Sequence, residues 1–392
     1  AGIKLGTSTA NHTEIYSGGG DISIKGSSTA TGQVDDRDES GIYQWGRMTM
    51  KSGRGAITMQ GTSGEYQGIG FTAPLTESDT GVKQLSMVSS KTSGTAIQLT
   101  GSSSAGVGVS FNYLNPKEVL SLGGGQVTIN GTGVGTYGID IQNLDVLSSS
   151  GDINMYGGTG GVNVKDRGVR FGSRLGSSVT SSSADLLVRG DDLEYDDLVV
   201  GFVNTLESTG GVVMESHSSS FSSAFDYENF DLGSTVSSFR VGRTTNAANV
   251  VIKEPVAMAG PISIYGGDIL LEKDLTSTLS GADVLVKGRG DIETIASRSV
   301  LTNNGDIVLW SNSDNSGGGS IVLGNDNVLN SSNGRSGDTD SGGGRITLGG
   351  GSGYGTIPTG YSSSSTGAGI KLGTSTANHT EIYSGGGDIS IK

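Results

Sequence analysis

Residues 305–309 read Gly-Asp-Ile-Val-Leu, and close copies of this stretch recur along the chain. The shared pattern is a glycine, any residue, an aliphatic residue, a residue that is mostly polar or small, and a second aliphatic residue. Successive side chains of a strand point to opposite faces, so the two aliphatic residues of each copy share one face. The pattern predicts many short strands with one apolar face. Copies lie at 20–24, 55–59, 125–129, 151–155, 267–271, 319–323 and 344–348, with variants at 95–99 and 161–164.

The spacing of these copies predicts how the strands are arranged. Ile269 and Ile307 are 38 positions apart, Ile307 and Ile346 are 39 apart, and a further copy with Ile321 lies between them. We expect coils of about 19 to 25 residues, each with two or three strands, stacked as in a repeat protein. The fold class predicted is all-β, a parallel β-helix with inward aliphatic ladders. An array of antiparallel β-sandwiches is the alternative, which the aromatic content of 6% disfavours.

Composition limits the function classes. The 392 residues include 69 Gly and no Cys, and the formal net charge is −14. An acidic surface disfavours nucleic acid and anionic membranes as partners. The sequence has no apolar run of about 18 residues that could cross a membrane. The first residues do not have the pattern of a signal peptide, so we expect any secretion signal to lie outside this segment.

One long identity frames the chain. Residues 1–25 and 368–392 have the same sequence, at an offset of 367 residues. We interpret residues 1–367 as one long β-solenoid repeat unit and 368–392 as the start of the next identical unit in a tandem array. A duplication made during cloning is one alternative. Another is that separate chains polymerise end to end through this segment.

Acidic and aromatic stretches interrupt the strand pattern, and we expect loops at 31–46, 190–198 and 215–236. Carboxylate clusters are candidate Ca²⁺ ligands, because Ca²⁺ takes six to eight oxygen ligands, although a solvated acidic loop is the simpler interpretation. The aromatic side chains either form a loop that binds a partner or cover the end of a coil. The candidate calcium ligands are Asp35, Asp36, Asp38, Asp191, Asp192 and Asp196, and the aromatic candidates are Phe221, Phe225, Tyr227 and Phe230.

The sequence gives little support for an enzyme. Some β-helices cleave polysaccharides with paired carboxylates, and Asp35 with Asp36 or Asp38 is the nearest such pair. Adjacent carboxylates in a loop do not establish a catalytic separation. Of the three histidines, His12 and His379 occupy the same repeat position. We therefore expect no catalytic residues and no cofactor other than the candidate Ca²⁺. A β-helix that binds or degrades polysaccharide is the alternative.

The stretches 267–269, 305–310 and 344–348, with their Asn-, Ser- and Gly-rich spacers, resemble filamentous-haemagglutinin-type adhesins and giant repetitive bacterial surface proteins. The resemblance covers residues 260–350 most clearly. It implies a right-handed parallel β-helix on the bacterial cell surface, with a role in adhesion, aggregation or a protective coat. The implied partners are further copies of the repeat, in series or side by side, and surface glycans or other cells. It carries over no catalytic residues.

Overall fold

The computed structural model describes residues 1–6, 12–30, 32, 39–71, 83–112, 116–134, 137–165, 170–172, 174–175, 178–179, 183–196, 204–332, 342–365, 367–375 and 379–392. Within these ranges the protein is all-β and contains no helix, and nearly all strand pairs are parallel. None of the described segments is therefore a helix that could cross a membrane. Two compact units are formed, residues 1–211 with 215–218, and residues 212–214 with 219–392. The boundary lies inside the predicted 367-residue unit.

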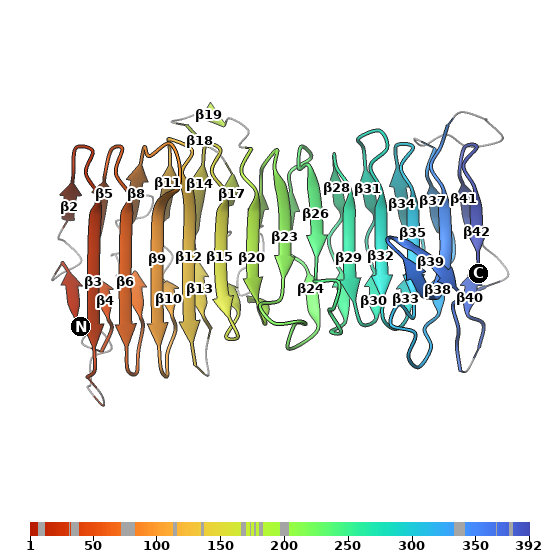
Figure 1. Cartoon of the computed structure of the whole chain (residues 1–392), viewed down its shortest axis with the longest axis horizontal. Coiled ribbons are helices and arrows are strands. Elements are labelled where there is room, and N and C mark those ends of the chain that lie inside the picture. The colour runs from red at the N-terminus through yellow and green to blue at the C-terminus, as the bar shows by residue number, and fades with distance from the viewer. Residues whose placement is uncertain are drawn as a thin grey trace. The chain divides into compact units, whose positions relative to one another are not determined.

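The first unit contains three parallel sheets that the chain visits in turn (Figure 1). We call one passage through the three sheets a circuit. The first sheet has the order β1 (Ile3–Leu5), β4 (Ile42–Gln44), β7 (Ile69–Phe71), β10 (Val109–Phe111), β13 (Ile139–Gln142), β16 (Val162–Lys165) and β21 (Leu193–Asp196). The second has the order β2 (His12–Tyr16), β5 (Arg47–Lys51), β8 (Leu85–Ser89), β11 (Lys117–Ser121), β14 (Leu144–Ser148), β17 (Arg170–Gly172) and β22 (Asn204–Leu206).

The third sheet of this unit has the order β3 (Ile22–Ser28), β6 (Ile57–Ser63), β9 (Thr95–Ser103), β12 (Gln126–Gly133), β15 (Ile153–Gly158) and β20 (Leu186–Gly190). Two short strands, β18 (Arg174–Leu175) and β19 (Ser178–Val179), pair antiparallel. The strand β23 (Gly211–Glu215) lies where the two units meet in the sequence.

The core of the first unit consists of aliphatic columns. Ile57 lies between Ile22 and Ile97 in register, and Val127, Ile153 and Leu186 continue this column. All of these side chains are buried. Each strand therefore contributes about two inward side chains, and stacking like residues along a column buries them although the chain is only 33% hydrophobic. The predicted aliphatic ladders are present in these sheets.

The second unit repeats this organisation of strands. One sheet has the order β26 (Ser238–Val241), β29 (Ile262–Gly266), β32 (Val284–Gly288), β35 (Ile307–Ser311) and β38 (Ile346–Tyr354), and β38 also pairs with β39 (Ile357–Gly360) and β42 (Ile389–Ile391). A second has β24 (Phe225–Tyr227), β27 (Val250–Ile252), β30 (Ile269–Leu271), β33 (Ile292–Thr294), β36 (Ile321–Leu323) and β40 (Ile370–Leu372). A third has β28 (Val256–Met258), β31 (Leu275–Ser277), β34 (Ser299–Thr302), β37 (Val328–Asn330) and β41 (Glu381–Tyr383), and β25 (Phe230–Leu232) precedes β28 in the chain.

A hairpin of β38 and β39 adds a small satellite core to the second unit. The strands pair antiparallel, and Figure 1 shows β39 lying across the sheet near β35. Trp310 is buried beside Leu285 and Val308, and its indole N–H donates to the carbonyl of Gly351 at 2.8 Å. The Nζ atom of Lys287 lies 3.7 Å from the centre of the Trp310 ring, a cation–π contact.

Two sequence expectations need correction. The spacing of Ile269, Ile307 and Ile346 served to predict the coil length, but β30 lies in a different sheet from β35 and β38 and pairs Ile269 with Val250 and Ile292. The circuits are also longer than expected in the first unit, where Ile57 and Ile97 are direct neighbours 40 positions apart. Strand alternation identifies one apolar face and does not tell which of the three sheets the strand joins.

Close backbone approach explains part of the glycine content. Gly61 and Gly101 pair in register, each beside the carbonyl of a glycine that precedes the next strand. A Cβ atom added at Gly101 would lie 2.0 Å from the carbonyl oxygen of Gly108. No real Cβ tolerates that separation, so the two sheets can approach this closely only without a side chain.

Candidate functional site

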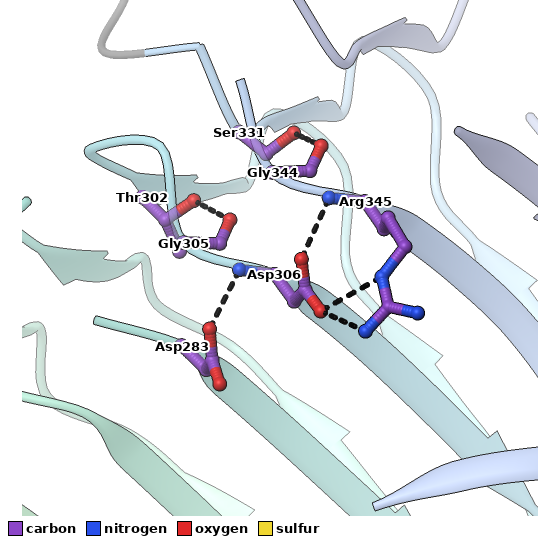
Figure 2. Close-up of polar contacts among 7 residues, drawn as sticks. All are labelled: Asp283, Thr302, Gly305, Asp306, Ser331, Gly344 and Arg345. Atoms are coloured by element: carbon purple, nitrogen blue, oxygen red, sulfur yellow. Dashed lines mark hydrogen bonds and ion pairs between the residues drawn. The ribbon is translucent and has the colours of Figure 1, made fainter. Parts of the chain in front are cut away.

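A ladder of carboxylates at the strand starts is the most ordered polar feature of the second unit. Asp283, Asp306 and Arg345 each directly precede a strand of one sheet, namely β32, β35 and β38 (Figure 2). The Asp283 carboxylate accepts the backbone N–H of Asp306 at 2.7 Å, and the Asp306 carboxylate accepts the backbone N–H of Arg345 at 2.8 Å. The side chain in one circuit thus binds the backbone of the next.

The guanidinium of Arg345 ends this part of the ladder. Its Nε and Nη2 atoms donate to one carboxylate oxygen of Asp306 at 3.1 and 2.7 Å. This hydrogen bonding raises the pKa of Arg345. Burial raises the pKa of Asp283, although the hydrogen bond from the backbone N–H of Asp306 acts in the opposite direction. The negative charge of Asp283 is therefore partly desolvated, and the geometry is that of a structural acceptor.

The same contact occurs elsewhere in both units. Asn249 takes the place of aspartate in one case and accepts the N–H of Asp268 at 2.9 Å, so a formal charge is not required. The ladder therefore depends on an acceptor oxygen bonded to Cγ, which both Asp and Asn provide. Further examples are Asp21 with Ala56, Asp152 with Asp185, Asp185 with Gly211, Asp268 with Asp291, and Asp291 with Ser320.

Hydroxyl groups close the turn before many of these strands. Thr302 donates to the carbonyl of Gly305 at 2.6 Å, and Ser331 donates to the carbonyl of Gly344 at 2.7 Å (Figure 2). Ser52 and Ser121 make the same contact at 2.6 Å with Gly55 and Gly125 in the first unit. These bonds satisfy buried turn carbonyls that have no strand partner.

A shallow groove runs beside one of these ladders in the second unit. It has a volume of about 260 Å³, and three carboxylates, those of Asp268, Asp291 and Glu293, line it. One carboxylate oxygen of Asp268 accepts a backbone N–H, and one of Asp291 accepts both the N–H and the hydroxyl of Ser320. Two of the three carboxylates are therefore held by structural hydrogen bonds.

Of the predicted calcium ligands, the structure describes the side chains of Asp191 and Asp192 only. Asp191 is buried and accepts the N–H and hydroxyl of Ser218 at 2.5 and 2.6 Å. Asp192 is half-buried, and Asp196 ends β21, so the expected loop over 190–198 is wrong at 193–196, which form a sheet strand. Asp35, Asp36 and Asp38 lie outside the described residues. Among the described side chains, no group of three or more His, Asp or Glu could hold a metal ion.

The aromatic candidates lie in the interior of the second unit. Phe221, Phe225, Tyr227 and Phe230 are each at most 5% exposed. Phe221 stacks on Phe225 at 5.1 Å between ring centres, and Tyr227 stacks on Phe230 at 5.7 Å. The expected loop is wrong at 225–227 and 230–232, which form β24 and β25. The four rings therefore contribute to the packing inside this unit.

Sequence reasoning missed the ladder, although a signal for it was available. Aspartate occupies the second position of the motif at residues 21, 152, 268 and 306. That position was treated as variable, because the alternation argument concerns only the aliphatic residues that follow. Repetition of one polar residue at a fixed place before a strand is the sign of a structural contact.

No family model matches this chain, and comparisons with curated proteins and with solved structures find no similar protein.

Proposed function

We propose that this chain is a structural repeat of a long extracellular surface fibre, built as a right-handed parallel β-helix that continues from one 367-residue repeat to the next. The observation that carries the proposal is the in-register parallel pairing of equivalent strands in successive circuits of each unit. Such stacking can be extended indefinitely, because each circuit contacts only its neighbours. The fibre serves adhesion, aggregation or a surface coat.

The polar ladders support this role. Asp283 and Asp306 each bind the backbone of the following circuit, so the contact acts along the stacking direction of its sheet. The chain has no cysteine, and these side-chain contacts supplement the backbone hydrogen bonds between circuits. The formal net charge of −14 favours solubility of a long assembly.

Binding of a polysaccharide is the second candidate function, and the groove beside Asp291 and Glu293 is the feature that favours it. An ionised carboxylate accepts hydrogen bonds, and the hydroxyl groups of a polysaccharide donate them. A Glu293→Gln variant should then lose glycan binding in a glycan array while its melting temperature stays unchanged. Equal glycan binding by the parent chain and the variant would contradict a polysaccharide site in this groove.

Electron cryomicroscopy of a chain with two full repeats tests the fibre directly. We expect a thin rod with an axial spacing of about 4.8 Å between strands. The sheet order from β3 to β42 has 12 steps for 367 residues, so a circuit averages about 31 residues. The axial repeat should therefore be about 60 Å. Globular beads joined by flexible linkers would contradict the proposal. Labelling of intact cells with an antibody against the repeat tests the surface location.

A further inference from the structure

The two identical segments, 1–25 and 368–392, form equivalent strands with different neighbours. In the first copy β1, β2 and β3 pair with β4, β5 and β6, which follow them in the chain. In the second copy β40, β41 and β42 pair with β36, β37 and β38, which precede them. The same 25-residue sequence therefore pairs with the following circuit in the first copy and with the preceding circuit in the second copy.

The backbone groups used in the two copies are different. Each parallel strand directs one set of N–H and C=O groups to one neighbour and the remaining set to the other. Residues 1–25 direct to the following circuit the N–H groups of Gly2, Ile3, Ser17 and Ile22 and the carbonyl of Leu5. Residues 368–392 direct to the preceding circuit the carbonyls of Gly369, Tyr383, Gly385 and Asp388 and the N–H groups of Gly373, Glu381 and Lys392. None of these groups is used twice, so both neighbours can bind one copy together.

Apolar side chains are also more exposed in the second copy than in the first, where Ile22 is buried and Leu5 and Ile24 are half-buried. Ile22 is 7% exposed beneath Ile57, whereas the equivalent Ile389 is 48% exposed. Leu372 and Ile391 are 44% and 47% exposed. Among the described strands, β40 and β41 are the last of their sheets. An apolar edge of this kind requires a cover.

We propose that a second copy of this repeat covers that edge and that the two copies share the segment 368–392 as one circuit. Residue 26 of the second copy then follows Lys392 directly, and its β4, β5 and β6 bind β40, β41 and β42. The register is fixed by the first copy, so that Ile389 lies opposite Ile57 and Glu381 opposite Thr49. This inference rests on the proposed fibre and defines its junction.

Charge argues against the other possible junction, in which two complete chains stack 368–392 on 1–25. That arrangement would place three like-charged pairs directly opposite each other, Lys371 with Lys4, Glu381 with Glu14, and Lys392 with Lys25. Like charges opposite each other in a sheet are destabilising. The shared circuit instead places Tyr43, Thr49 and Gln60 at these positions.

Arg345 interrupts the carboxylate ladder, and the shared circuit restores it at the junction. Asp21 accepts the backbone N–H of Ala56 at 2.7 Å. Asp388 is the residue equivalent to Asp21. It lies in the circuit after Arg345, and its backbone carbonyl accepts the N–H of Ile346. Ala56 of the second copy would donate to Asp388 in the same way.

A single introduced thiol tests the junction, because the chain has no cysteine. Ile391→Cys is placed in three chains: residues 1–392 alone, residues 1–392 followed by 26–392, and residues 1–392 followed by 1–392, with the substitution only at the junction in the longer chains. The rate of maleimide alkylation is measured in each. We expect alkylation to be at least about 100-fold slower in the second chain than in the first, because an opening reaction must precede it.

Two controls make the result specific. Leu279→Cys, at an exposed position away from the junction, should react equally in all three chains. Ile57→Asp in the second copy should restore fast alkylation at position 391, because it places a charge opposite Ile389. Equal alkylation of the first and second chains overturns the shared circuit, as does equal protection in the third chain. Globular beads in micrographs of the second chain would instead overturn the fibre, whatever the alkylation rate.

Discussion

At the scale of single residues, the second position of the strand motif holds successive circuits together. Asp283 accepts the N–H of Asp306, and burial raises the pKa of Asp283. Asn249 makes the equivalent contact without a charge. The contact therefore depends on an oxygen acceptor, whereas the charge of Asp283 carries a desolvation cost.

Substitution of Asp283 separates these two effects. Asp283→Asn keeps the acceptor and removes the charge of a side chain that solvent still reaches, so stability at pH 7 should stay within about 0.5 kcal/mol of the parent chain. Asp283→Ala leaves the Asp306 N–H without its acceptor and should cost about 1 kcal/mol. Denaturant unfolding of both variants measures the difference. If the alanine variant is as stable as the asparagine variant, the ladder contributes nothing to stability.

Lys117 is a second residue whose environment conflicts with its charge. It occupies an inward position of β11 between Leu85 and Leu144, and its Nζ atom donates to the carbonyl of Gln142 at 3.2 Å. Burial lowers the pKa of Lys117 to about 7. Between pH 7 and the ordinary lysine pKa, Lys117 is protonated in the unfolded chain and neutral in the folded chain. The unfolded state therefore binds more protons, and this residue makes the free energy of unfolding rise with pH over that window.

Lys117→Met should remove this dependence. We expect the variant to be more stable than the parent chain at and below pH 7, with the advantage shrinking by about 1.4 kcal/mol per pH unit as the pH rises toward 10. Urea unfolding at pH 7, 8 and 9 measures it. Lys371→Met, at an exposed position, is the matched control and should show no such trend. A constant difference across pH for the Lys117 variant would contradict the lowered pKa.

At the scale of elements, the sequence predicted the strands better than their placement. The alternation in 55–59 and 95–99 correctly indicated β6 and β9, whose aliphatic residues form one column. The similar stretch 267–271 forms β30 in another sheet. The difference arises because the turns before a strand decide which sheet it joins, and turns of varying length leave no periodic signal.

The aromatic and acidic stretches show a second limit. Phe225 and Tyr227 alternate as in a strand, yet their serine-rich surroundings suggested a loop. Burial of the rings depends on Phe230 and Phe239, which contact Tyr227 from other strands. Similarly, the role of Asp191 depends on Ser218, 27 positions later. Contacts at such separations follow from tertiary structure, and local pattern does not reveal them.

Glycine columns between sheets give a prediction at this scale. Gly101→Ala places a Cβ atom 2.0 Å from the carbonyl oxygen of Gly108 and should destabilise the first unit by about 1–3 kcal/mol. Gly64→Ala is the matched control, because its nearest neighbouring atoms are 4.0 Å away. Thermal unfolding compares the two variants. Equal melting temperatures would mean that the sheets separate without cost.

At the scale of the whole molecule, calcium dependence remains a hypothesis that a chelator can test. In the described residues, carboxylates such as those of Asp191 and Asp306 bind backbone or side-chain donors of the protein. We therefore expect the melting temperature to be unchanged when EDTA is added and when Ca²⁺ is restored. A lower melting temperature in EDTA would assign the ion to the acidic stretches, and Asp36→Asn and Asp192→Asn would then locate it.

The complementary edges of the identical end segments have a consequence for the gene. Recombination between the two copies of such a segment adds or removes 367 codons at a time. Every product would contain only strand neighbours that already exist in this structure, β38 with β42 on one side and β3 with β6 on the other. Alleles that differ in the number of repeats would then encode proteins of different reach and equal fold, and selection could adjust length without testing any new interface.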